Sequence, residues 1–220
     1  MNQRVINVSV LLTFLMILGC GTVTTIRPIR KGESAFALSC GGPVTHVSGI
    51  NIPLPYTVIR YRYGLNNNLN LYGGSHLLLF ALGDIGLDAG ISYHFLKQTK
   101  WIPAVGIGAG IYGFSKPGKD IRVFPELELT GSYIFGSRFL TYFGTQSMYQ
   151  LAEKPTVVLA PFIGEEVRIS KKLSITLETK WYAPSEITKP RVVEYKIPIS
   201  NHGAFGFVFG LNYLLGGWYE

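Results

Sequence analysis

The sequence predicts a closed, antiparallel, up-and-down transmembrane β-barrel of about ten strands, with eight strands as the alternative. Three observations predict it: apolar and polar residues alternate strictly, the connections between strands are alternately short and long, and the charges of the polar face nearly balance. The clearest alternation is DIGLDAGISYHF, residues 84–95, where every odd position is apolar and every even position is polar or glycine. Such a pattern is typical of a β-strand with one apolar face and one polar face.

Residues 1–19 are predicted to be a cleaved signal peptide. Arg4 precedes an apolar run that ends at Leu18, and the small residues Gly19 and Cys20 follow. A charged start, a short apolar core and a small-residue cleavage site are typical of a secretory signal. The core is too short to predict a membrane-spanning helix.

The stretch ILGC, residues 17–20, resembles the lipobox of bacterial lipoproteins. In that family the cysteine is diacylated through its sulfur and becomes the new N-terminus. The resemblance implies a diacylated Cys20, while an ordinary secretory signal with a chance cysteine is the alternative. We therefore expect an exposed, lipidated tether over residues 20–31 and a barrel domain over 32–220. Acylation of Cys20 would leave Cys40 without an intramolecular disulfide partner.

Ten candidate strands follow the tether, and no segment keeps a helical period for long. They cover residues 34–42, 55–64, 68–80, 84–96, 101–114, 121–135, 138–149, 156–169, 172–183 and 203–215. The faces of 138–149 cannot be assigned from its sequence, RFLTYFGTQSMY.

The connections between these strands differ in length. Those at 65–68, 97–100, 136–138 and 170–172 are short, whereas 42–55, 115–120, 149–155 and 184–202 are mostly longer. Short turns on one side and longer loops on the other are typical of outer-membrane barrels. An even number of strands places both termini on the short-turn side, so we expect the Cys20 anchor on the periplasmic side of an outer membrane.

The polar faces carry eleven charged residues that we predict to form a network inside the barrel. They are Arg60, Arg62, Asp84, Asp88, Arg122, Glu126, Glu128, Glu166, Arg168, Glu178 and Lys180. Five are basic and six acidic, which favours a closed interior, because an unpaired buried charge costs several kcal/mol. Apolar residues such as Ile59, Leu87 and Leu177 occupy the opposite faces and would contact lipid.

Composition and motifs exclude several other classes of protein. The chain has 220 residues, 47% hydrophobic residues and a formal charge of +7 that is scattered over turns and strands, so we expect no nucleic-acid partner. The glycine-rich VGIGAGIYG, residues 105–113, continues a strand pattern with no helix after it, unlike a dinucleotide-binding loop. One thiol and scattered histidines predict no metal site, and we expect no cofactor.

Residues 56–95 resemble outer-membrane β-barrel proteins, some of them lipoproteins, in which a hairpin of RYGL-turn type leads into a strand of DIGL type. The final strand, AFGFVFGLNYLL, resembles the signal that barrel-assembly machinery reads, although GGWYE follows it. The resemblance implies outer-membrane lipid and that machinery as partners, and it carries no catalytic residues.

Four functions stay open at this point. We expect a structural or surface-interaction protein with a lumen plugged by paired charges, whose loop 184–202 contacts a partner. The alternatives are a narrow channel for small solutes or ions, a hydrolase or acyltransferase at the rim, and a soluble periplasmic barrel with an apolar ligand in its core. The rim enzyme would use His76, Asp84 and Asp88. We do not expect an enzyme, because the sequence pairs no nucleophile with a base.

Overall fold

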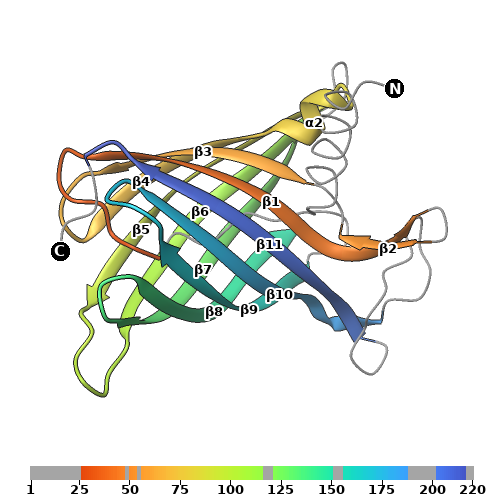
Figure 1. The fold of residues 1–220 in the computed structure, drawn as a ribbon. Helices are drawn as coiled ribbons and strands as arrows, with labels where there is room; N and C mark the ends of the chain where they lie inside the picture. Colours follow the sequence, from red (N-terminus) through yellow and green to blue (C-terminus); the bar gives the residue numbers. More distant parts are fainter. Residues whose placement is uncertain are drawn as a thin grey trace, which may run out of the picture.

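The computed structural model describes residues 26–47, 50–53, 56–115, 121–150, 156–187 and 202–216. The chain forms β1 (Ser34–Val47), β2 (Ile50–Pro53), β3 (Thr57–Gly64), β4 (Leu69–His76), α2 (Leu77–Ala81), β5 (Ile85–Leu96), β6 (Ala104–Ser115), β7 (Ile121–Phe135), β8 (Phe139–Gln150), β9 (Thr156–Arg168), β10 (Leu173–Ile187) and β11 (His202–Leu214). All strands except β2 build one barrel of tilted strands (Figure 1).

The barrel is closed and antiparallel. From β3 to β11 each strand pairs with the next one in the sequence, and β1 pairs with β3 on one side and β11 on the other. The closing ladder runs from Ala35 opposite Leu214 to Pro43 opposite Gly206. The predicted fold with ten strands is therefore confirmed, and the eight-stranded alternative is wrong.

The two ends of the barrel differ in their connections. At the short-turn end, the connections 65–68, 97–103, 136–138 and 169–172 link adjacent strands, and β1 begins where β11 ends. The first of these turns is fixed locally, because Asn66 Oδ1 accepts hydrogen bonds from the backbone N–H groups of Asn68 and Leu69, both at 2.8 Å. Helix α2 and strand β2 lie at the opposite, long-loop end (Figure 1).

The alternation along the strands places polar residues inside and apolar residues outside. Leu87 and Leu177 are 50% and 57% exposed on the outer surface, whereas Asp88 and Glu178, their neighbours in the chain, are buried. A fully formed ladder satisfies the backbone groups of the wall, so the side chains alone decide what each surface can contact. The inner surface is largely polar and the outer surface is largely apolar.

Three predicted boundaries at the long-loop end are wrong. The predicted strand 172–183 continues to Ile187 as β10, into the predicted loop 184–202. The predicted strand 68–80 ends at His76, because LLLFA (77–81) lacks alternation and forms the single-turn helix α2, which ends before Gly83 at φ +81°. Within the predicted loop 42–55, β1 continues to Val47 and pairs with β2, residue 44 opposite residue 53. In the described part of the chain, no helix has the length and apolar character needed to span a bilayer.

The expectation of an exposed tether up to residue 31 is wrong at Ile26, Arg27 and Ile29, whereas Pro28, Arg30 and Lys31 are exposed. Ile26, Arg27 and Ile29 are 5%, 5% and 1% exposed, because this segment lies across the inside of the barrel at the short-turn end. We call residues 26–30 the N-terminal strap. The signal peptide 1–19 and Cys20 lie outside the described residues.

Candidate functional site: the barrel lumen

Buried polar side chains fill the lumen, and their charges balance. The buried carboxylates are Asp88, Glu126, Glu166 and Glu178, and the buried cations are Arg27, Arg60, Arg62 and Lys180. These four anions and four cations come from the strap and from five strands, β3, β5, β7, β9 and β10. Their balance is what a closed interior requires, because each buried charge needs a partner of the opposite sign.

A first cluster lies toward the long-loop end and is centred on Asp88 of β5. Its Oδ1 accepts a hydrogen bond from Arg60 Nε at 3.0 Å, and its Oδ2 lies 3.0 Å from His76 Nε2. Arg60 Nη2 also donates to the Tyr112 hydroxyl at 3.3 Å, and the Tyr56 hydroxyl contacts His76 Nδ1. The carboxylate is thus held between a guanidinium and an imidazole.

Glycines make room for this cluster. The Arg60 guanidinium lies 4.6 Å from the centre of the Tyr72 ring, in a cation–π arrangement. A Cβ at Gly90 or Gly110 would lie 2.4 Å or 2.5 Å from the Tyr72 hydroxyl oxygen, closer than atoms can approach. Gly90 of β5 and Gly110 of β6 therefore leave space in the lumen for the Tyr72 side chain. The glycine-rich stretch 105–113 is part of strand β6, as predicted.

A second cluster joins β7, β8 and β10 in the middle of the lumen. Lys180 Nζ lies 3.0 Å from Glu178 Oε1 and donates to Gln146 Oε1 at 3.1 Å. Gln146 Nε2 donates to Glu126 Oε1 at 2.7 Å, and the Tyr142 hydroxyl donates to Glu178 Oε2 at 2.9 Å. A single ammonium group thus links two carboxylates, one directly and one through an amide.

The third cluster holds the N-terminal strap at the short-turn end. Arg27 Nε donates to Glu166 Oε1 at 2.6 Å, and Arg62 Nη2 donates to the Arg27 carbonyl oxygen, also at 2.6 Å. The Ile29 N–H donates to Asn70 Oδ1 at 3.0 Å. These partners belong to β9, β3 and β4, so the strap is tied to opposite parts of the wall.

Apolar contacts complete the attachment of the strap. Ile26 packs with Leu140, Tyr142 and Phe162, whose side chains point inward from β8 and β9. On the other side, Ile29 packs with Ala35 and Leu214, near the seam between β1 and β11. The strap therefore lies across the opening at the short-turn end.

The structure places the eleven predicted lumen charges in three groups. Seven are buried: Arg60, Arg62, Asp88, Glu126, Glu166, Glu178 and Lys180. Asp84, Glu128 and Arg168 are half-buried, and Arg122 is exposed. Arg122 has the inward parity, but it lies one residue from the start of β7, where the wall ends.

Several lumen residues were not predicted. Arg27 lies outside any strand, so no alternation marks it. Gln146 and Tyr142 belong to the strand whose faces could not be assigned. The inward parity of Asn70 could have identified it, because it alternates with Leu69 and Leu71.

Of the three residues predicted for a rim enzyme, His76, Asp84 and Asp88, the structure brings His76 and Asp88 into contact. His76 lies beside Asp88, but Asp84 precedes β5 and its backbone N–H donates to the Leu79 carbonyl at 2.8 Å. The His76 ring is 1% exposed and packs edge-on against Tyr56, Tyr112 and Phe114. A substrate cannot reach it in this conformation. Among the residues that the structure describes, no group of three His, Cys, Asp or Glu side chains could hold a metal ion.

The lumen is filled along much of its length. Asn70, Glu178 and Ser174 are fully buried, and His76 and Lys180 are 1% exposed. These residues belong to β4 and β10 and lie at different levels between the two ends. These side chains are therefore shielded from water in this structure.

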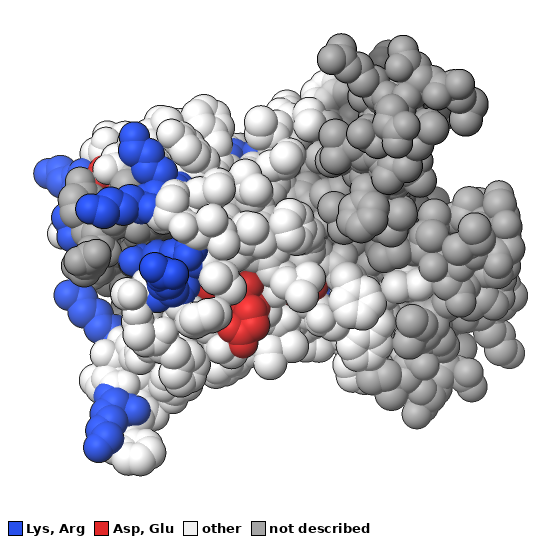
Figure 2. Space-filling view, viewed as in Figure 1, with Lys and Arg blue, Asp and Glu red and all other residues white. Residues whose placement is uncertain are grey.

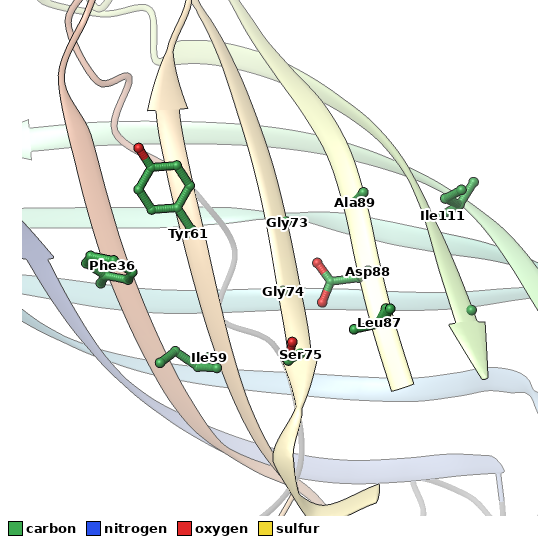
Figure 3. Close-up of a pocket in the computed structure, with 11 residues that line it drawn as sticks. Phe36, Ile59, Tyr61, Gly73, Gly74, Ser75, Leu87, Asp88, Ala89 and Ile111 are labelled. Carbon is green, nitrogen blue, oxygen red and sulfur yellow. The ribbon is translucent and has the colours of Figure 1, made fainter. Parts of the chain in front are cut away.

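A groove of about 570 Å³ lies on the outer surface, between β3, β4, β5 and β6. Figure 3 shows that Gly73 and Gly74 leave a gap between the side chains of Ile59 and Tyr61 on one strand and Leu87 and Ala89 on another. Asp88 lies behind Gly74, at the inner side of the wall. This apolar concavity therefore lies on the outer surface, whereas the lumen is lined largely by polar side chains.

No protein-family model and no characterised protein matches the sequence. Solved structures with a similar fold include the NanC porin, at 10% identity and a TM-score of 0.46, covering 83% of this chain and 99% of that one. The translocator domain of the autotransporter NalP from Neisseria meningitidis is 10% identical, with a TM-score of 0.42 and coverages of 84% and 89%. The outer membrane protein Ail from Yersinia pestis is 10% identical, with a TM-score of 0.39 and coverages of 84% and 100%.

Proposed function

We propose that this protein is an outer-membrane β-barrel lipoprotein with a structural or surface-interaction role, and that its lumen is plugged rather than open. The observation that carries the proposal is the inverted polarity of the barrel: its outer surface is apolar and its interior holds four buried carboxylates and four buried cations. Water cannot solvate such an exterior, whereas hydrocarbon can contact it without cost. The closed ladder leaves no edge to pair in lipid.

The orientation follows from the two ends. We place the short-turn end in the periplasm and the long-loop end outside the cell, as in outer-membrane barrels generally. Cys20 precedes Ile26 by six residues, which can span roughly 20 Å when extended. Because Ile26 lies just inside the short-turn end, a diacylated Cys20 can reach the periplasmic leaflet. The loop 184–202 would then present its surface outside, although residues 188–201 lie beyond the described ones.

The deciding experiment is folding of residues 20–220 with and without phospholipid vesicles. We expect aggregation in buffer and folding in vesicles, with faster gel migration before heating than after it. A soluble, cooperatively unfolding monomer in plain buffer would contradict a membrane barrel. Metabolic labelling with a clickable palmitate analogue tests the anchor, which Cys20→Ser should abolish and Cys40→Ser should leave intact.

A narrow channel is the second candidate, and the N-terminal strap is the observation that favours it. The contacts that hold the strap at the short-turn opening include the Arg27–Glu166 ion pair and the hydrogen bonds of its backbone with Arg62 and Asn70, so its departure would expose polar groups in the lumen. We expect background conductance for the intact protein in planar bilayers. Stable conductance steps from the intact protein would contradict a plugged lumen and favour the channel function.

A further inference from the structure

The short-turn end carries a strongly basic rim. Seven cations in its connections are exposed: Arg30, Lys31, Lys97, Lys100, Arg138, Lys171 and Lys172. Among the described residues of the connections at this end, Glu33 is the one carboxylate. Figure 2 shows the Lys and Arg side chains gathered at this end of the molecule. We call these seven residues the basic rim.

The basic rim is not part of the balanced lumen network. Inside the barrel, buried cations form ion pairs with buried carboxylates, as Arg27 does with Glu166 and Arg60 with Asp88. At the rim, cations from the strap and from three separate hairpins stand around the same edge with little negative charge between them. The cations of this edge repel one another unless anions from outside the protein bind there.

Apolar side chains directly beside the basic rim indicate where those anions lie. Trp101 is 81% exposed, and Phe135 and Phe139 are 58% and 53% exposed on either side of the turn that contains Arg138. Lys100 Nζ lies 5.5 Å from the centre of the Trp101 ring. Aromatic side chains of this kind sit at the boundary between hydrocarbon and headgroups, so the neighbouring ammonium and guanidinium groups would lie at the level of the lipid phosphates.

We propose that the basic rim binds the headgroups of anionic phospholipids in the leaflet at the short-turn end, in preference to zwitterionic ones. This inference rests on the proposed insertion of the barrel into a membrane. Cations next to a bilayer surface attract anionic lipid individually and additively, so seven around one edge form a selective annulus. The aromatic neighbours favour lipid over a soluble anion, because a soluble anion gains nothing from an adjacent apolar belt.

The test uses Trp101 as a local reporter of lipid composition. The full mature chain carries Trp181→Phe and Trp218→Phe, which leaves Trp101 as the single tryptophan. It is inserted into vesicles of equal parts phosphatidylglycerol and phosphatidylcholine, in which one lipid or the other has brominated chains that quench fluorescence. We expect quenching to report about a threefold preference for phosphatidylglycerol at low salt.

Two variants localise the effect. Lys97→Gln with Lys100→Gln should bring the preference near Trp101 close to unity, and high salt should weaken it in the unmodified rim. Arg122→Gln removes an exposed cation at the opposite end and should leave the preference unchanged. Equal quenching by both lipids in an inserted barrel would overturn the lipid proposal alone. Failure to insert into any vesicle, read from unheated gel migration, would overturn both this proposal and the membrane barrel.

Discussion

Strands β5 and β8 are both paired on two sides in the same barrel, yet their sequences look different. In β5 the outward residues Ile85, Leu87 and Ile91 are apolar, and the inward ones are glycine, Asp88 and Ser92. In β8 the inward residues include Leu140 and Tyr142, while hydroxyl groups stand on the outer face among Phe139 and Phe143. The strands share a backbone geometry, so the difference must come from what each one faces.

The N-terminal strap explains this difference. The inward side of β5 meets Arg60 and His76, and needs a carboxylate there. The inward side of β8 meets Ile26, and needs apolar groups to cover it. On the outer face, Thr141 Oγ1 is satisfied by Glu165 Oε1 at 2.7 Å and Ser147 Oγ by the Leu127 carbonyl at 3.2 Å. The inner face of a barrel strand is therefore set locally, by whatever fills the lumen opposite it.

The largest effect in this comparison is expected from Asp88→Ala in β5. It leaves Arg60 buried without its carboxylate, which should cost about 3–5 kcal/mol of folding free energy. Urea titration of the barrel in vesicles measures it. Ser92→Ala, on the same face of the same strand, is the matched control and should cost far less. Equal stability of the two variants would mean that the buried pair does not hold the β5 side of the lumen.

A smaller effect tests whether β8 has been assigned the correct faces. Phe143→Arg places a charge on the outer surface near the middle of the strand, and should cost about 2–4 kcal/mol in a bilayer. Ile91→Arg, at the middle of β5, should cost about the same, since both side chains would face hydrocarbon. If Phe143→Arg folded as well as the parent while Ile91→Arg did not, the outer face of β8 would not contact lipid.

The order and pairing of the strands could be predicted from the sequence because alternation and turn residues are local signals. The ten barrel strands were expected within a few residues of their ends, apart from the extensions of β1 and β10 and the shortening of β4 by α2. Inward parity also identified seven buried charges. The choice of Arg60 over Arg62 or Arg122 as the partner of Asp88 depends on the register between strands, which alternation alone does not fix.

The strap could not be predicted for a physical reason. The stretch TTIRPIRK, residues 24–31, has no strand period, and its Pro28 and charges are also what an exposed leader would contain. Its burial arises from contacts with residues distant in the sequence, from Arg62, 35 positions from Arg27, to Glu166, 139 positions from it. The strap also explains why the faces of β8 could not be assigned from the sequence. Leu140 and Tyr142 point inward because they pack against Ile26 of the strap.

The smallest of the three effects addresses that contact directly. Ile26→Ala removes the side chain that packs with Leu140, Tyr142 and Phe162, and should cost about 2 kcal/mol, the low end for such a truncation, because the cluster lies near an open end. Lys31→Ala, just beyond the strap and exposed, should change stability by less than about 0.5 kcal/mol when the vesicles contain phosphatidylcholine alone, which offers the basic rim no anionic lipid. Both are measured by urea titration in vesicles. If the two variants unfolded at the same urea concentration, the strap would not be packed in the lumen, and the inward Leu140 and Tyr142 of β8 would need another explanation.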